Sequence, residues 1–175
     1  MKNLKRIILS TIVASALSVG AVAQNINNAS LWVKPKNPIA KGSESNKNLQ
    51  TVVAFFQAYG KGDYEAIKKV VAEDVEWHIP GKHKLSGTKK GVDELVAFFN
   101  KLGAAGFKAE PMIFAANENY VIDAHRGWST KAKNGENVDL NWILLYQIVD
   151  GKIKRVQNFS GDTYASDEFF DRFFK

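Results

Sequence analysis

The spacing of apolar residues predicts the helices of this chain. Leu49, Val53 and Phe56 recur on one helical face, which Val52 widens, and Gly60 follows where such a helix ends. After Gly91, a second apolar stripe begins beside two acidic residues, which are favoured in the first turn of a helix. The predicted helices are about 48–60, a short helix capped by Asp63 and ending near Glu73, a helix from about Val92 to Leu102, and a terminal helix capped by Ser166.

Alternation of apolar and polar residues predicts the strands. The segment from Val75 to Pro80 alternates and is broken by Pro80-Gly81. Asp150-Gly151, between two alternating runs, is the signal of a two-residue hairpin. The other predicted strands are about 107–116, 119–131, 137–149 and 152–160. The order ααβα, then four strands, then a helix separates most strands from most helices, which predicts an α+β fold.

Residues 1–23 have the pattern of a secretory signal peptide. Three basic residues precede an apolar run that ends in Ala21-Val22-Ala23. Serine, threonine and glycine dilute this run, which favours cleavage before Gln24 over a membrane anchor. We therefore expect an exported protein, periplasmic or secreted, with no stable membrane insertion after cleavage.

Composition limits the chemistry of the remaining chain. Removing residues 1–23 lowers the formal net charge from +6 to +3, because this segment holds three basic residues and no acid. There is no cysteine for disulfides or thiol chemistry. Residues 24–47 are rich in Asn, Ser, Lys and Pro, so we expect a flexible arm before one domain over 48–175. The three histidines lack metal-ligand spacing, and we expect no metal, no cofactor and no nucleic-acid partner.

Short motifs follow one another in a fixed order over the predicted domain. They are VEWHIPG at 75–81, LSGT at 85–88 with Gly91, HRGW at 125–128, and DGKI at 150–153 leading through Gly161-Asp162 to Phe169-Phe170. This ordered set resembles the SnoaL-like group of the nuclear transport factor 2-like superfamily, which is related to polyketide cyclases and ketosteroid isomerases. The resemblance implies a cone, in which helices close a strongly curved mixed sheet around a mostly apolar cavity, often in a homodimer.

Three candidate catalytic residues stand at predicted strand ends or on predicted strands. In the ketosteroid isomerases that the chain resembles, an aspartate base lies at the end of the first strand. Alignment places Trp77 there, whereas a shift by one residue offers His78, which is either a base or a structural histidine. Asp123 and His125 share a strand face, which is the geometry in which a carboxylate can orient an imidazole. An ordinary surface contact fits the same spacing equally well. Asp162 is either an acid/base at the cone mouth or a helix cap.

Aromatic residues are the candidates for the cavity wall. Trp142 and Tyr146 share a strand face, and Tyr146 offers a phenol either to a ligand or to a local partner. Trp128 lies on the face opposite His125 and lines the same cavity only if a bulge intervenes at Gly127. The candidate ligand-pocket residues are Trp77, Trp128, Trp142, Tyr146 and Asn158.

Apolar residues occur on both faces of the predicted strand 137–149, which indicates that both faces are covered. We therefore predict a homodimer in which a partner subunit covers the second face. Three interpretations of function stay open. The protein binds a small apolar or carbonyl-bearing molecule and performs acid/base chemistry on it, as an isomerase, cyclase or hydrolase does; it binds such a molecule without turnover; or it is a dimeric interaction module.

Overall fold

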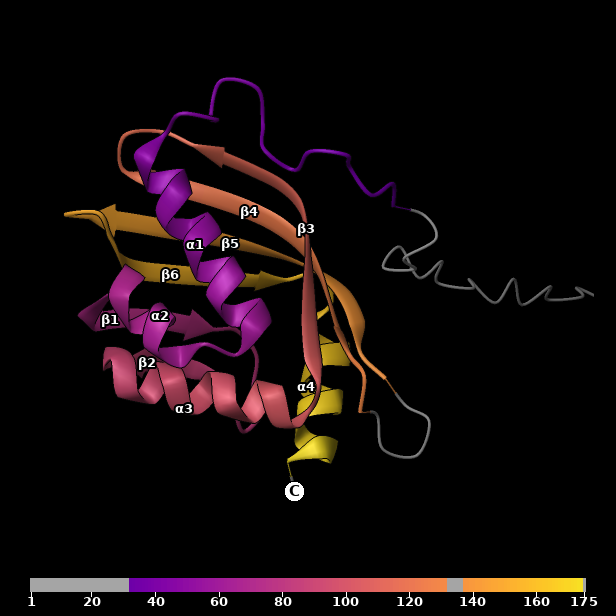
Figure 1. Cartoon of the computed structure of the whole chain (residues 1–175). Helices are drawn as coiled ribbons and strands as arrows, with labels where there is room; N and C mark the ends of the chain where they lie inside the picture. The colour runs from indigo at the N-terminus through magenta and orange to yellow at the C-terminus, as the bar shows by residue number, and fades with distance from the viewer. Residues whose placement is uncertain (1–31, 132–136, 175) are drawn as a thin grey trace, which may run out of the picture.

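The computed structural model describes residues 32–131 and 137–174, which form a curved, unclosed sheet with helices against it (Figure 1). The elements are α1 (Lys47–Lys61), α2 (Tyr64–Val70), β1 (Val71–Ile79), β2 (Gly87–Lys90), α3 (Gly91–Ala104), β3 (Phe107–Ala116), β4 (Tyr120–Ser129), β5 (Asp139–Val149), β6 (Lys152–Ser160) and α4 (Thr163–Phe173). This order confirms the predicted α+β fold, with β2 as one additional short strand. The predicted signal peptide lies outside the described residues.

The sheet is mixed, as predicted. Its strand order is β2-β1-β6-β5-β4-β3, with β1 and β6 parallel and the other neighbouring pairs antiparallel. The β5–β6 hairpin turns at Asp150 and Gly151, whose φ angles of 50° and 74° are those of the mirror-image turns that fit the twist of paired strands. This hairpin fixes the register between the strands that carry Trp142, Tyr146 and Asn158.

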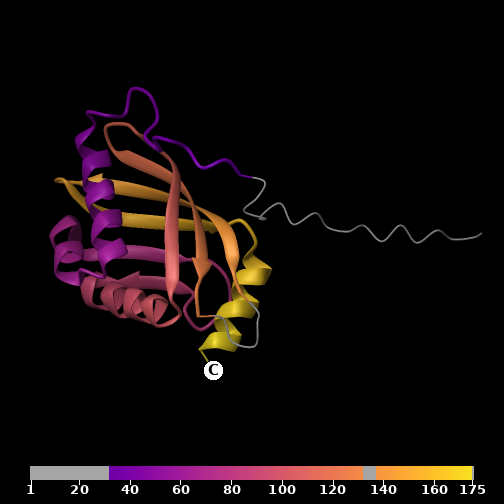
Figure 2. The same cartoon turned by 45° about the vertical axis from the view of Figure 1, so that its right-hand side comes forward.

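Helix α1 lies across the concave face of the sheet, and α3 runs along it beside β1 and β2 (Figures 1 and 2). The side chain of Asn46 caps α1 by accepting from the amide of Leu49, and Gly62 ends the helix in the left-handed region. Leu49, Val52, Phe55 and Ala58 are the buried residues of α1. Leu49 and Val52 are thus buried as predicted, whereas Val53 and Phe56 of the predicted stripe pack at the margin of the buried face.

Two predicted boundaries are wrong for identifiable reasons. Helix α2 ends at Val70, earlier than predicted, because Val71 already pairs with Ile153 of β6 and begins β1. The terminal helix begins earlier than predicted because Asp162, and not Ser166, is its N-cap. Ser166 is instead a buried residue inside α4, where its hydroxyl donates to the carbonyl of Thr163.

The convex face of the sheet carries exposed apolar side chains. They are Ile113, Tyr120, Ile122, Ile143, Leu145, Val149 and Phe159. The N-terminal segment pairs with the β3 edge, where the amide of Ala40 donates to Phe114 and the carbonyl of Pro38 accepts from it. Among the described residues, no helix is long and apolar enough to span a membrane.

Candidate functional site

A cavity of about 70 Å³ lies between the helices and the concave face of the sheet. Its wall is mostly aromatic and aliphatic. The lining residues are Phe55, Phe56, Tyr59, Trp77, Ile79, Phe98, Phe99, Leu102, Phe107, Ala109, His125, Trp142, Leu144, Tyr146, Asn158 and Phe170. His125 is the one histidine among them, so the mostly apolar wall carries an imidazole, a side chain that can act as a general acid or base.

Three polar side chains form a buried chain at this wall. On β4, alternation turns Asp123 and His125 to the concave face. Oδ1 of Asp123 is 2.5 Å from Nδ1 of His125, and its Oδ2 accepts a hydrogen bond of 2.6 Å from the phenol of Tyr146 on β5. Asp123 and Tyr146 are fully buried, whereas 10% of the His125 side chain is exposed. Both carboxylate oxygens are thus used inside the protein.

This arrangement determines which nitrogen of His125 faces the cavity. Tyr146 donates to one oxygen of Asp123, and burial followed by the nearby Asp123 charge raises the pKa of this phenol well above its usual range. The phenol therefore stays a donor, and the carboxylate accepts the Nδ1–H of His125 through its other oxygen. Nε2 has no partner among the described residues and is left to accept a proton from a molecule in the cavity.

A second buried polar pair lies across the cavity wall. Nε1 of Trp77 on β1 donates to Oδ1 of Asn158 on β6 at 3.0 Å. The indole of Trp77 also contacts the rings of Phe55, Phe99 and Tyr146, with centroids 5.2 to 5.8 Å apart. Packing and hydrogen bonding together hold this pair in one orientation.

Trp142 occupies the wall next to His125, its register partner on the neighbouring strand. Its indole packs against Gly127, where an added Cβ would lie 2.8 Å from Cδ1 and Nε1. The β4–β5 ladder keeps its register at Gly127, so there is no bulge at this position that would turn Trp128 to the cavity. The irregularity lies in β3 instead, between Pro111 and Ile113. Glycine at 127 provides space for the tryptophan.

Comparison with known protein families identifies the family of this chain. The family model of the SnoaL-like domain matches residues 52–156, which include β1 through most of β6. The chain belongs to the SnoaL-like family. One relative is the uncharacterized protein Rv0034 of Mycobacterium tuberculosis. It is 29% identical over 127 residues, which cover 70% of this chain and 95% of the relative.

Solved structures agree with this placement within the nuclear transport factor 2-like superfamily. Bal32a, from a soil-derived mobile gene cassette, is 25% identical and covers 72% of this chain and 98% of its own, with a TM-score of 0.68. An NTF2-like protein of Burkholderia xenovorans LB400 is 26% identical, covers 74% of this chain and 99% of its own, and has a TM-score of 0.61. The SnoaL-like domain therefore shares the cone-shaped fold that the sequence motifs indicated.

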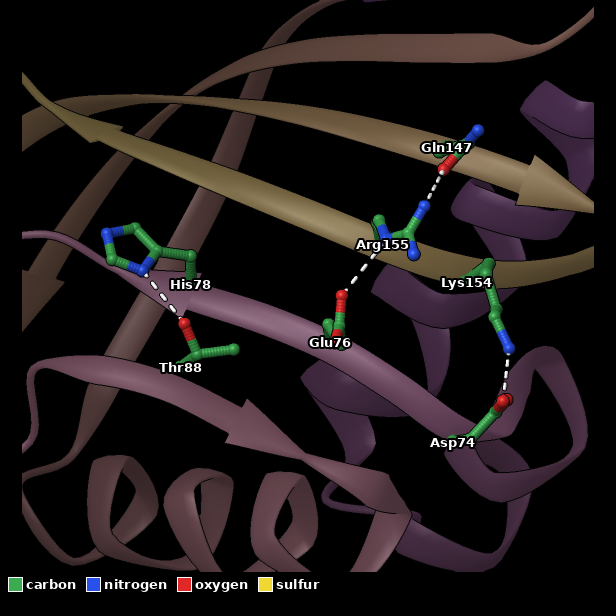
Figure 3. A network of polar contacts seen from close by, with 7 residues as sticks. All are labelled: Asp74, Glu76, His78, Thr88, Gln147, Lys154 and Arg155. Carbon is green, nitrogen blue, oxygen red and sulfur yellow. Dashed lines mark hydrogen bonds and ion pairs between the residues drawn. The ribbon is translucent and has the colours of Figure 1, made fainter.

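The structure places His78 away from the cavity of the SnoaL-like domain. In β1, Val75, Trp77 and Ile79 are buried on the concave side, so His78 points to the convex side, where Nδ1 lies 3.1 Å from the hydroxyl of Thr88. Figure 3 shows this pair beside the polar chain in which Arg155 bridges Glu76 and Gln147, and the ion pair of Lys154 with Asp74. His78 therefore does not reach a molecule bound in the cavity.

Two other candidate residues also lie outside the cavity wall. The carboxylate of Asp162 accepts from the amide of Ala165 at 3.0 Å and so caps α4. Trp128 lies on the convex side, where the guanidinium of Arg126 stacks 4.6 Å from its ring and binds Asp139 through two nitrogens. Of the candidate residues, His125, Trp77, Trp142, Tyr146 and Asn158 line the cavity.

The helices contribute wall residues that motif reasoning did not identify. Phe56 meets the ring of His125 edge-to-face at a centroid distance of 5.6 Å, and Tyr59, one helical turn further, donates to the carbonyl of Phe107 at 3.4 Å. Phe170 of α4 stacks on Phe107 at 5.9 Å and closes one end. The helical spacing of Phe56 and Tyr59 was the available signal, but it did not show which strand they would face.

Proposed function

We propose that this SnoaL-like protein is an enzyme that moves a proton on a small, mostly apolar carbonyl compound, using only groups of its own chain. The observation that carries the proposal is the buried Asp123–His125 pair, which opens into an apolar cavity through Nε2 of His125. A surface histidine would not need a carboxylate whose second oxygen is held by a buried tyrosine. A carboxylate that orients an imidazole is a common arrangement for general acid/base catalysis.

The proposed step is enolisation. Nε2 of His125 takes a proton from the carbon next to the carbonyl group, and the electron pair of the broken C–H bond forms a C=C bond. The carbonyl π pair moves to oxygen and gives an enolate. Asp123 stabilises the imidazolium that forms, and the imidazolium then returns the proton to the same carbon or to another carbon of the enolate system. Isomerisation and aldol-type cyclisation both begin with this step.

The size of the cavity supports a compact substrate. Its volume of about 70 Å³ is roughly half that of an engineered apolar cavity, ~150 Å³, that binds benzene. The same observation favours a second candidate function, a ligand-binding or dimeric interaction module without turnover, because the cavity is largely filled by the protein's own rings. Catalytic proton exchange separates the two functions.

The proposal also includes where the protein works and in which assembly. The signal-peptide pattern of residues 1–23 supports export to the periplasm or the medium. The exposed apolar side chains of the convex face, among them Ile143, Leu145 and Phe159, support a homodimer in which two sheets pack together. The cavity opens on the other side of the sheet, so both cavities of such a dimer stay available.

Deuterium exchange of small ketones tests the proposed function. Acetone and butanone are incubated with the protein in D₂O, and the loss of the protons next to the carbonyl group is followed by ¹H NMR. We expect exchange above the buffer rate with the natural protein and at the buffer rate with His125→Gln. His78→Gln is the matched control on the convex face and keeps the rate. Exchange that is absent in the natural protein, or equal in His125→Gln, contradicts the proposal.

A further inference from the structure

The side-chain amide of Asn158 is held in the cavity wall with its donor group unused. Asn158 lies on β6, on the concave face, and is buried. Its backbone carbonyl accepts from the side chain of Gln157, and its Oδ1 accepts from Trp77. Nδ2 has no hydrogen-bond partner among the described residues.

Trp77 determines which way this amide points. An indole nitrogen carries a hydrogen and can only donate, so the atom 3.0 Å from it must be the amide oxygen of Asn158 and not the nitrogen. The indole cannot turn away, because it is fully buried among the rings of Phe55 and Phe99. Nδ2, with its two hydrogens, is therefore directed away from Trp77.

The amide nitrogen is also accessible. Three polar atoms of the described residues are enclosed without a partner, namely Nε2 of His83, Nδ2 of Asn141 and Nε1 of Trp142, and Nδ2 of Asn158 is not among them. Because Asn158 is a cavity-lining residue, the space that Nδ2 reaches is the cavity. An N–H group that faces an otherwise apolar space favours a ligand that brings an acceptor oxygen.

The register of the sheet places this donor opposite the base. Asn158 pairs with Leu144 of β5, and Leu144 pairs with Asp123 of β4. The backbones of Asn158 and Asp123 are thus two strand spacings apart, about 10 Å, and their side chains point to the same concave side. Leu144 lies between them on the same face and also lines the cavity, so a molecule that reaches both Nδ2 of Asn158 and Nε2 of His125 lies over Leu144.

We propose that Asn158 binds the carbonyl oxygen of the substrate through Nδ2, and that Trp77 is the positioning residue that keeps this donor turned to the cavity. The inference rests on the proposed function, because it assigns the oxygen site for the same enolisation. As His125 removes the proton, negative charge grows on the oxygen and strengthens the hydrogen bond from Asn158. The substrate class is a small ketone or aldehyde with a hydrogen on the neighbouring carbon.

Acetone and isobutene form a matched pair of probes, because they differ only in an oxygen that replaces a CH₂ group. Dissociation constants for both are measured by NMR titration of the full mature chain. Asn158→Leu has nearly the same shape and removes the donor. It also removes the acceptor of Trp77, and Trp77→Phe shows what the loss of that hydrogen bond does by itself. We expect Asn158→Leu to bind acetone about tenfold more weakly, as for a lost hydrogen bond, and to bind isobutene within about twofold. Equal weakening of both probes, or unchanged acetone binding, overturns the proposal.

Gln157→Met is the matched control, because it likewise replaces an amide by an apolar side chain of similar size, on the opposite face of the same strand. It is expected to leave both dissociation constants unchanged. Trp77→Phe tests the positioning role, since it removes the indole N–H while Asn158 keeps its amide. The expected result is a smaller preference for acetone over isobutene. An unchanged preference overturns the positioning role of Trp77.

A measurement on the natural protein keeps the proposal testable if a variant does not fold. The carbonyl carbon of [2-¹³C]acetone resonates further downfield when its oxygen accepts a hydrogen bond. We expect bound acetone to shift downfield relative to acetone in cyclohexane, and an unshifted resonance overturns the oxygen site. Binding with this shift but without deuterium exchange would refute the proposed proton transfer alone and leave the oxygen site established.

Discussion

The phenol of Tyr146 donates a hydrogen bond of 2.6 Å to Asp123, the same carboxylate that binds His125. The two residues lie on neighbouring strands, where Asp123 pairs with Leu144, so Tyr146 is its diagonal neighbour on the concave face. This hydrogen bond gives the second oxygen of a fully buried carboxylate a donor. The hydroxyl of Tyr146 therefore binds the carboxylate that orients His125, and it is not offered to a ligand.

Tyr146→Phe keeps the ring and removes the hydroxyl. We expect a loss of about 1–3 kcal/mol in the free energy of unfolding, because one oxygen of buried Asp123 loses its donor. Urea denaturation measures this loss. Tyr164→Phe is the matched control at an exposed position on α4 and is expected to change stability by less than about 0.5 kcal/mol. Equal effects of the two changes would contradict the structural role of the Tyr146 hydroxyl.

The stability of the protein at alkaline pH should depend on the same hydroxyl. Burial and the Asp123 charge raise the pKa of Tyr146 in the folded protein, whereas the unfolded chain has the usual value of about 10. The stabilisation is thus complete below about pH 10 and is lost as the pH rises from there toward the folded-state pKa. Above about pH 10, the free energy of unfolding should fall less steeply in Tyr146→Phe than in the natural protein. The difference between the two slopes should be roughly 1.4 kcal/mol per pH unit. A slope in Tyr146→Phe equal to that of the natural protein would contradict this prediction.

Asp123→Asn should separate catalysis from folding. An amide at this position cannot accept from both Tyr146 and His125 as a carboxylate does, so the imidazole loses its orientation and the imidazolium its counter-charge. We expect ketone deuterium exchange to fall by about 10²- to 10⁴-fold. Asp162→Asn makes the same change at the α4 cap, where Asn and Asp serve equally well, and should leave exchange and stability unchanged. A loss of exchange in Asp162→Asn would instead return that residue to the catalytic site.

Gly127 should tolerate no side chain. A Cβ there would lie 2.8 Å from the indole of Trp142 and 2.9 Å from the ring of Phe107, and both rings are held by further packing. Gly127→Ala should therefore destabilise the protein by about 1–3 kcal/mol in urea denaturation. Gly60→Ala, inside α1 with open space around it, should instead stabilise by roughly 0.5–1 kcal/mol. Effects of the same sign at both sites would contradict this account of the cavity wall.

The convex face should mediate dimer formation. Ile143 is 43% exposed at the centre of this face, next to Leu145 and opposite Phe159. Light scattering after size exclusion is expected to give about twice the chain mass for the natural protein and the mass of one chain for Ile143→Lys. Tyr164→Lys, at an exposed position on α4, should leave the dimer intact. A natural protein that elutes as a monomer would contradict the dimer.

Local periodicity predicted most of the fold. The α+β order and the Asp150-Gly151 hairpin follow from spacing and turn chemistry, which act within a few residues. The Asp123–His125 contact was also predictable as one of two alternatives, because residues two apart on a strand always share a face. What spacing could not decide was whether that face was the concave one.

The rest of the site depends on contacts between distant segments. Trp77 and His78 lie on opposite faces of β1, and only the pairing of β1 with β6 determines that Trp77 meets Asn158 inside the sheet. The contact of Tyr146 with Asp123 depends in the same way on the β4–β5 register. The aromatic wall contributed by α1 and α4 requires the angle at which each helix crosses the sheet, which no local pattern contains.

The most direct test of the central claim is the protonation state of the His125 ring, read from its ¹⁵N resonances by NMR in the natural protein and in Asp123→Asn. Neutral His125 is expected to carry its proton on Nδ1, facing Asp123, and to leave Nε2 unprotonated toward the cavity. The Nδ1–H form should lose its dominance in Asp123→Asn. A neutral ring protonated mainly on Nε2 in the natural protein would contradict the assignment of His125 as the base.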